Sequence, residues 1–394
     1  MLYLDHAATT PLDPAVLEAM RPYLTEHYGN ASSVHALGRR ARVAVEEARG
    51  RVADVLGCAP AEVVFTSGGT EGDNAALRGV LTGPALAQTG RPGLVTSAAE
   101  HEAVRQTAEA LDDEGHPVAI LRPGRHGALT PAQVDAALDA STGLVSVMRV
   151  NNEIGTVSPV AAIAERAHAA GALVHTDAVQ AVGLLPLDVE ALGVDLLSLS
   201  GHKVYGPKGI GALFVRAGTP FSPLLRGGSQ ERRRRGGTEN VAAIVGLAEA
   251  LVQAEERRGA EAARLARLQR RLAERLRASF GEGVVFNTPL DGVHPDPHPV
   301  APHILSVSFP PQEGAAVDGE MLLLALDMAG VCVSSGSACA SGAIEPSHVL
   351  LALGAERATA AATIRFSLGR STDPAAVDKA ADHLDAVVRR LRGL

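Results

Sequence analysis

The sequence has 394 residues, and 46% of them are hydrophobic, which is enough apolar material for a substantial buried core. A net charge of −8 argues against a general nucleic-acid binder, and no apolar run approaches the length of a membrane span. Three scattered cysteines are too few for a disulfide framework, and no Cys-x-x-Cys pair suggests a zinc site. We therefore expect a cytoplasmic protein that binds neither nucleic acid nor membranes.

Short apolar runs rich in β-branched residues alternate with alanine-rich helical runs through the first part of the chain. This alternation predicts an α/β fold in which a mostly parallel sheet is flanked by helices. A helix is expected at 161–170, and strands are expected at 63–65, 93–96, 118–121, 144–150, 172–175, 196–199 and 211–215.

A long segment rich in alanine, leucine, arginine and glutamate, 241–280, predicts a single helix that joins two domains. We expect a large domain at 12–250. The smaller α+β domain is expected to combine 1–11 with 251–394. Its predicted elements are strands at 304–309 and 363–368, a helix near 320–328 and a terminal helix from Pro374.

Lysine is rare in this chain, because only Lys203, Lys208 and Lys379 among the 36 basic residues are lysines. Arginine carries surface charge equally well but cannot become a nucleophilic amine. Lys203 follows the apolar run 194–199, and burial would lower the pKa of its amine, which could then form a Schiff base with an aldehyde. A glycine-rich turn with solvated lysines is the equally consistent alternative.

The segment 65–74 contains a strand end, a glycine turn and a helix start. Such a turn presents backbone N–H groups and a hydroxyl to an anion, and the helix dipole favours a phosphate there. An ordinary capped glycine turn would have the same sequence. Neither a Walker loop nor a Gly-x-Gly-x-x-Gly fingerprint is present in this segment.

Polar residues follow other predicted strands, at the edge where ligands of open α/β sheets bind. His101 could stack on a ligand or protonate it, although a surface role is ordinary for one of 14 histidines. The adjacent Asn151 and Asn152 suit either a turn or a hydrogen bond to a ligand. Asp177 is more informative, because a carboxylate at the end of a buried strand needs a cationic partner, and a pyridinium nitrogen would serve.

In this order, the phosphate turn, histidine, aspartate and lysine resemble the fold-type I pyridoxal-phosphate (PLP) enzymes of the class V aminotransferase-like branch. Motifs spaced along nearly the whole chain are similar to those of the cysteine desulfurases, of the nitrogen-fixation or iron–sulfur-cluster type. These motifs lie at 3–11, 151–155, 177–180, 200–211, 226–231, 237–240, 334–339 and 364–369.

The resemblance implies a role for each matched position. Lys203 would form the Schiff base with PLP and later move protons, Asp177 would pair with the ring nitrogen, and His101 would stack on the ring. Arg365 would bind the substrate carboxylate in a two-pronged geometry, although a structural ion pair is its ordinary alternative. Gln180 and Asn152 would lie near the phenolic oxygen, and Asn152 would also lie near the substrate. The phosphate ligands would be Gly69, Thr70, Ser200, His202 and, from the other subunit of a homodimer, Thr238.

Cys339 lies in a stretch of serine, glycine and alanine, and we expect a mobile loop around 334–343. The resemblance implies that the Cys339 thiolate attacks the sulfur of L-cysteine, leaving L-alanine and a persulfide on Cys339. The persulfide sulfur would pass to an acceptor protein such as an iron–sulfur scaffold. Cys58 and Cys332, in contrast, follow apolar residues and suit small buried side chains.

Other functions remain open on the same fold, namely a selenocysteine lyase or another aminotransferase-like PLP enzyme. An aminotransferase would not need Cys339. A rival from another class is a sulfur-relay or scaffold-binding protein with an inactive pocket. The presence of Lys203, Asp177, His101 and Arg365 together argues against that rival.

Overall fold

The computed structural model describes residues 1–295, 297–312, 316–335 and 345–393. Within these ranges, seven strands form a central sheet in which β8 alone runs antiparallel to its neighbours. The predicted α/β class with a mostly parallel sheet is therefore confirmed. In spatial order the strands are β2 (Val63–Thr66), β8 (Gly211–Val215), β7 (Leu196–Ser200), β6 (Leu173–Asp177), β5 (Thr142–Ser146), β3 (Gly93–Ser97) and β4 (Val118–Leu121).

The largest difference from a predicted strand is in β5, which ends at Ser146 and does not continue to Val150. The backbone N–H of Met148 donates to the Glu100 side chain at 2.9 Å and is lost to the strand ladder. Val150 then pairs with Val157 across a turn. An apolar run alone does not reveal that a neighbouring carboxyl group takes over a backbone donor.

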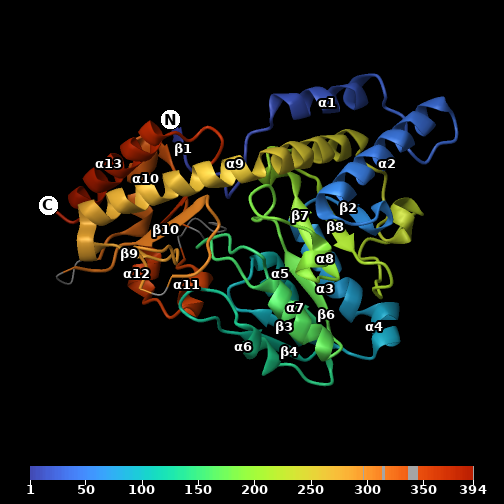
Figure 1. The fold of residues 1–394 in the computed structure, drawn as a ribbon, viewed down its shortest axis with the longest axis horizontal. Coiled ribbons are helices and arrows are strands. Elements are labelled where there is room, and N and C mark those ends of the chain that lie inside the picture. Colours follow the sequence, from blue (N-terminus) through green and yellow to red (C-terminus); the bar gives the residue numbers. More distant parts are fainter. Residues whose placement is uncertain (296, 313–315, 336–344, 394) are drawn as a thin grey trace.

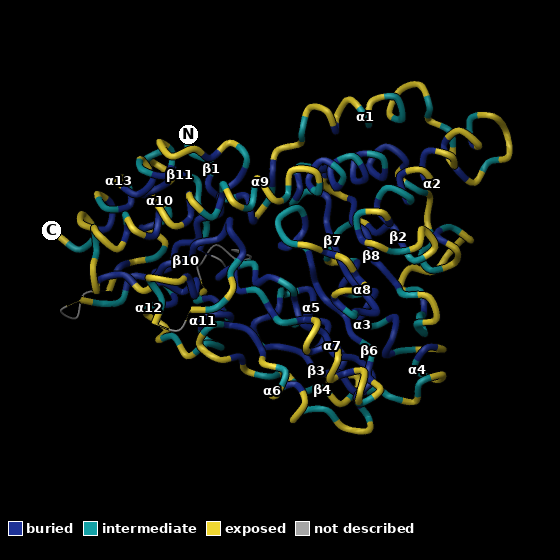
Figure 2. Tube along the Cα trace, viewed as in Figure 1, coloured by how far each residue is buried: buried dark blue, intermediate teal, exposed yellow. Residues whose placement is uncertain are grey.

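Helices cover both faces of the central sheet, and its strands other than the edge strand β4 are mostly dark in the burial view (Figure 2). Leu144 belongs to one hydrophobic cluster, with residues of α3 (Gly69–Leu81) and α5 (Glu102–Asp113). The next residue, Val145, belongs to another cluster, with residues of α2 (Ala36–Leu56), α7 (Val160–Ala169) and α8 (Val189–Leu192), as the two-residue period of a strand requires. The helices of this part are α1 (Pro14–Thr25), α2 (Ala36–Leu56), α3 (Gly69–Leu81), α4 (Gly83–Thr89), α5 (Glu102–Asp113), α6 (Pro131–Asp135), α7 (Val160–Ala169) and α8 (Val189–Leu192).

Helix α9 (Val241–Phe280) runs along both parts of the molecule (Figure 1). It begins where the Asn240 side chain accepts a hydrogen bond from the Ala243 N–H at 3.2 Å. Its buried residues up to Ala254 join the cluster of the central sheet, and those from Leu265 onward join a second cluster. This change of partners supports the division into two domains, which we keep as a proposal.

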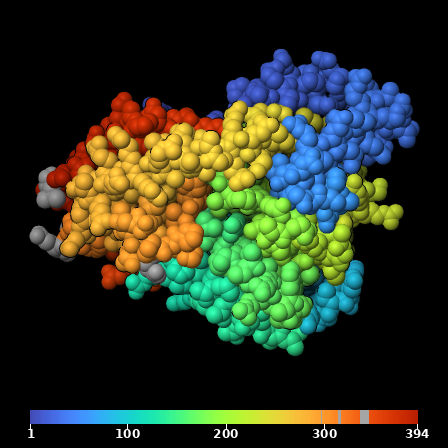
Figure 3. Space-filling view, viewed as in Figure 1, coloured from blue at the N-terminus to red at the C-terminus, as the bar shows by residue number. Residues whose placement is uncertain are grey.

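The second cluster contains an antiparallel sheet of β12 (Thr363–Ser367), β10 (Ile304–Ser308) and β9 (Val285–Phe286). The N-terminal strand β1 (Leu2–Tyr3) pairs in parallel with β11 (Val331–Cys332), far along the chain. In the space-filling view this C-terminal part, orange and red, abuts the green part of the central domain (Figure 3). Its helices are α10 (Gly319–Met328), α11 (His348–Ala352), α12 (Arg357–Ala361) and α13 (Pro374–Leu391). Along the whole chain, the short 3-10 turns of the described residues are η1 (Pro60–Glu62), η2 (Gly201–Lys203), η3 (Gln230–Arg233) and η4 (Gly281–Gly283).

None of the helices in the described ranges combines the length and the apolar character that crossing a membrane requires.

Candidate active site

The carboxyl ends of β2, β6 and β7 lie at one edge of the central sheet, and the turns that follow them build the candidate site. As predicted, the turn after β2 leads into a helix, which begins at Gly69. A Cβ atom on Gly69 would lie 2.7 Å from Cγ2 of Val179, in the turn after Asp177. Only glycine therefore allows these two turns to approach so closely.

A hollow of about 430 Å³ opens at the N-terminus of α3. The turn after β2, the turn after β7 and the N-terminal segment surround it. The first turn of a helix has backbone N–H groups without helical partners, so an anion is favoured there. The hollow brings together the expected Gly69, Thr70, Ser200 and His202, and it adds Thr9, Lys208, Ser67, Gly68, Ala8, Glu71 and Gly209.

The positive charge in the lining of this hollow comes from Lys208 rather than from His202, while Glu71 in the same lining is paired with Arg235. Burial, followed by the positive charges of Lys203 and Lys208, lowers the pKa of His202 to about 4. His202 is therefore neutral at pH 7 and offers a hydrogen bond instead of a charge. Its Nδ1 lies 3.2 Å from the Thr9 hydroxyl.

Lys203 ends η2, directly after the buried strand β7. Its amine donates to the backbone oxygens of Ala7 and Ala8 at 2.6 and 2.8 Å. Burial, and then the positive charge of Arg365, lowers the pKa of Lys203 to about 8, while Asp177 and Asp5 oppose this shift. An appreciable share of the amine is therefore neutral and nucleophilic near neutral pH.

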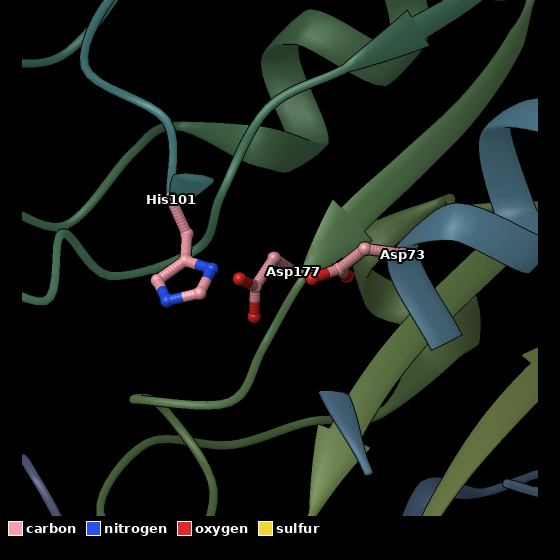
Figure 4. A group of neighbouring side chains, drawn as sticks. All are labelled: Asp73, His101 and Asp177. Atoms are coloured by element: carbon pink, nitrogen blue, oxygen red, sulfur yellow. The ribbon is translucent and has the colours of Figure 1, made fainter. Parts of the chain in front are cut away.

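Asp177 is the last residue of β6, and its carboxylate accepts a hydrogen bond from the Val179 N–H at 2.8 Å. Figure 4 shows Asp177 between the His101 ring and the Asp73 carboxyl group, and ligand atoms of the three lie within 4.8 Å of one another. Burial raises the pKa of Asp177, and the nearby His101 and Lys203 oppose that rise. No arginine or lysine of the described ranges forms an ion pair with it. A cationic ligand atom would therefore supply the partner that this buried carboxylate lacks among the described residues.

His101 is the N-cap of α5, and its Nδ1 accepts a hydrogen bond from the Ala103 N–H at 3.1 Å. Because Nδ1 is an acceptor, the proton of the neutral ring is on Nε2. His101 can therefore present an N–H group while its position is fixed by the helix start.

Arg365 reaches the site from β12 and is almost fully buried. It donates to the backbone oxygen of Asn152 at 2.8 Å and to the Asp5 carboxylate at 3.0 Å. The ion pair with Asp5 is the structural role that the sequence left open for this residue. Its buried Nε has no partner among the described residues, so this N–H remains for a ligand beside the second hydrogens of Nη1 and Nη2.

The two adjacent asparagines have different environments. Asn151 stabilises a turn, since its side-chain oxygen accepts from the N–H groups of Glu153 and Ile154 at 2.9 and 3.0 Å. The buried side-chain oxygen of Asn152 has no partner in the described part of the chain. Gln180 is buried nearby and donates to Ala7, whose backbone oxygen also binds Lys203. Asn152 is thus the asparagine with capacity for a ligand.

One predicted site residue of the described ranges is not brought to this edge. Thr238 is exposed and does not line the hollow of its own chain, and Cys339 lies outside the described residues. Cys58 and Cys332 are half-buried rather than fully buried, because they lie in a turn after a helix and in a two-residue edge strand. Burial still raises the pKa of Cys58 to about 12, which suppresses its thiolate.

Sequence reasoning missed several residues of the site. Lys208 was singled out as a rare lysine but not as a neighbour of the anion hollow, and Thr9 and Asp5 lie in an N-terminal motif to which no role was given. Asp73 had a readable signal, because this acidic residue shares a face of α3 with Ala76 and Leu77, one turn later.

Comparison with known proteins places the chain in a family. The model of the family described as aminotransferase class-V matches residues 2–380. The chain is 44% identical to a cysteine desulfurase of Trichormus azollae, and the match covers 100% of this chain and 94% of that protein. It is 45% identical to a putative cysteine desulfurase IscS 1 of Bacillus subtilis, over 99% of both chains.

Solved structures agree with the sequence comparison. A NifS-like protein superposes with a TM-score of 0.88 at 35% identity, over 99% of both chains. A structure described as SspA in complex with cysteine has a TM-score of 0.79 at 34% identity and covers 93% of this chain and 99% of that one. The chain belongs to the class-V aminotransferase family and, within it, to the cysteine desulfurases.

Proposed function

We propose that this protein uses PLP to remove sulfur from L-cysteine, giving L-alanine and a persulfide on Cys339. The observation that carries the proposal is the Lys203 amine, whose pKa is lowered by burial, near the carboxylate of Asp177. Asp177 is itself buried and has no ion-pair partner among the described residues. The cysteine complex of a related structure supports the choice of substrate. The persulfide sulfur would pass to an acceptor protein such as an iron–sulfur scaffold.

The residues at the sheet edge fit PLP by three features. The anion hollow suits a phosphate, with Gly69, Thr70, Ser200 and His202 as its ligands. Asp177 would hold the ring nitrogen as a cation. Lys203 would hold the aldehyde carbon. When bound, PLP would withdraw electrons from the α-carbon of the substrate. His101 would lie against the ring, and Asn152 and Gln180 would lie near its phenolic oxygen.

The chain's own groups then divide the work. The Lys203 amine, once free, would take the α-proton, since its pKa of about 8 suits a base near neutral pH. Arg365 would orient the substrate through its carboxylate. The Cys339 thiolate would attack the substrate sulfur, so that an S–S bond forms and the C–S bond breaks. The electron pair of the C–S bond stays on the β-carbon of the substrate, which takes a proton and becomes the methyl group of alanine. His101 Nε2–H is a suitable proton donor.

Replacing Arg365 with lysine tests the carboxylate site. Lysine keeps the positive charge but loses the planar two-pronged donor, so we expect kcat/KM for L-cysteine to fall about 100-fold, mostly through KM. The ethyl ester of L-cysteine lacks the carboxylate and serves as the matched control substrate, for which the variant and the wild type should differ little. An equal loss on the ester would instead assign Arg365 to the ion pair with Asp5 alone.

We further propose that the protein is a homodimer in which Thr238 completes the phosphate site of the partner subunit. Exposed apolar side chains on α1 and after it support an interface there, because Leu24, Tyr28 and Val34 are 59%, 72% and 87% exposed. These segments lie at the outer edge of the molecule (Figure 1). Sedimentation should give a dimer, and Thr238→Ala should weaken PLP binding severalfold. A monomer with full PLP affinity would refute this proposal.

A further inference from the structure

A polar layer lies beneath Asp177 inside an otherwise apolar face of the central sheet. His175 is completely buried in β6, two residues before Asp177 on the same face. Its ring nitrogens lie 2.9 Å from the Ser146 hydroxyl and 3.0 Å from the Ser198 hydroxyl, on the two neighbouring strands. Burying polar groups costs stability, so this layer needs an explanation beyond packing.

Asp73 covers this layer from α3. The close approach of α3 depends on Gly72, where a Cβ atom would lie 3.0 Å from the Ser198 hydroxyl. Asp73 is 1% exposed, and its Oδ1 lies 3.6 Å from Nε2 of His175 without a hydrogen-bond partner among the described residues. Figure 4 shows its carboxyl group directed toward Asp177.

The layer contains more potential negative charge than it can hold. Asp73, Glu100 and Asp177 are all buried, and no arginine or lysine of the described ranges pairs with any of them. Burial and then the Asp177 charge raise the pKa of Asp73 well above its ordinary value. Burial also lowers the pKa of His175 to about 3, so His175 supplies no compensating cation. Like charges this close do not both ionise in a buried site, and the charges of His101 and Lys203 oppose the rise in the pKa of Asp177.

We propose that Asp73 is a neutral carboxylic acid that positions Asp177 and confines the negative charge of this layer to the Asp177 carboxylate. In this proposal Asp73 acts through Asp177. The effect of Asp73 on PLP binding rests on the proposed function. The protonation of Asp73, in contrast, is a property of the protein without cofactor.

The first test uses melting temperatures of the full chain without PLP. If Asp73 is protonated when folded, the native state holds a proton that the unfolded chain releases above about pH 4, so wild-type stability decreases as pH rises. Asp73→Asn keeps the shape and needs no proton. The melting temperature of Asp73→Asn, relative to that of the wild type, should therefore rise by about 1–2 °C per pH unit between pH 5 and 8.

Asp373→Asn is the matched control, because Asp373 is an exposed N-cap and asparagine caps equally well. It removes the same charge and should show no such gain. A gain for Asp73→Asn that does not grow with pH, or a loss at every pH, would mean that Asp73 is ionised and would overturn the proposal.

The second test uses PLP affinity and the pH dependence of the visible absorption of the bound cofactor. Asp73→Asn should match the wild type within about threefold in PLP affinity, whereas Asp73→Ala should shift the pH midpoint of the absorption. If Asp73→Asn instead loses affinity tenfold, as expected for Asp177→Asn, Asp73 is an anion that helps to hold the ring. A wild type that takes up no PLP would refute the proposed function, and the melting test would still decide the state of Asp73.

Discussion

Lys203→Arg is expected to abolish the visible absorption of bound PLP and to lower alanine production from L-cysteine by about 10³-fold or more. Arginine keeps the charge near the backbone oxygens of Ala7 and Ala8, but it cannot become a neutral amine. The loss would therefore report the amine chemistry of Lys203 rather than the charge. An absorption spectrum and an alanine assay of the purified variant measure both effects.

The pH dependence of PLP uptake gives the same prediction a second form. With a pKa of about 8, the neutral fraction of Lys203 rises with pH and levels off above that value. The rate at which cofactor-free protein gains its visible absorption should therefore rise about tenfold per pH unit below pH 8 and then reach a plateau. Lys379→Arg, at an exposed position of α13, is the control and should behave as the wild type. A Lys203→Arg variant that retains the absorption would show that another group binds the aldehyde.

Cys339→Ala is expected to stop alanine release, with a fall of about 10³-fold or more, because neither Cys58 nor Cys332 lines the hollow at the candidate site. The visible absorption of PLP and its change on addition of L-cysteine should be retained, since both depend on Lys203 and Arg365. Single-turnover assays of alanine, with the spectrum recorded in parallel, separate these two properties.

Cys58→Ala is the matched control for this experiment. Burial raises the pKa of Cys58 to about 12, so its removal should leave alanine release unchanged. If Cys339→Ala released alanine at the wild-type rate, sulfur would leave the substrate without a thiol acceptor on this loop, and the persulfide step would be wrong.

Local sequence patterns were sufficient for most of the fold. The predicted bounds of α9 and β8 agree with the structure, because β8 is a continuous apolar run and α9 is a continuous run rich in alanine, leucine, arginine and glutamate. The strand predicted at 144–150 was too long, since the Glu100 side chain, distant in sequence, takes the Met148 N–H. An apolar run contains no information about such a long-range hydrogen bond.

Some residues of the candidate site could likewise be predicted from the sequence, and others could not. The order of strand ends predicted that Gly69, Asp177 and Lys203 meet at one edge, because parallel strands bring their carboxyl ends together. The N-terminal segment could not be placed from the residues alone, although its Ala7 oxygen binds Lys203, 196 positions away. The same is true of the Asp5 pair with Arg365, which joins β12 to the start of the chain.

The central claim, that this chain converts L-cysteine through PLP held by Lys203, is tested most directly by one assay on the purified wild type. The visible spectrum is recorded, L-cysteine is added with a thiol reductant that takes the place of the sulfur acceptor, and alanine and sulfide are quantified. The account predicts a visible band that changes on addition of L-cysteine, with alanine and sulfide formed in equal amounts. A colourless protein that takes up no added PLP, or alanine formed without sulfide, would contradict it.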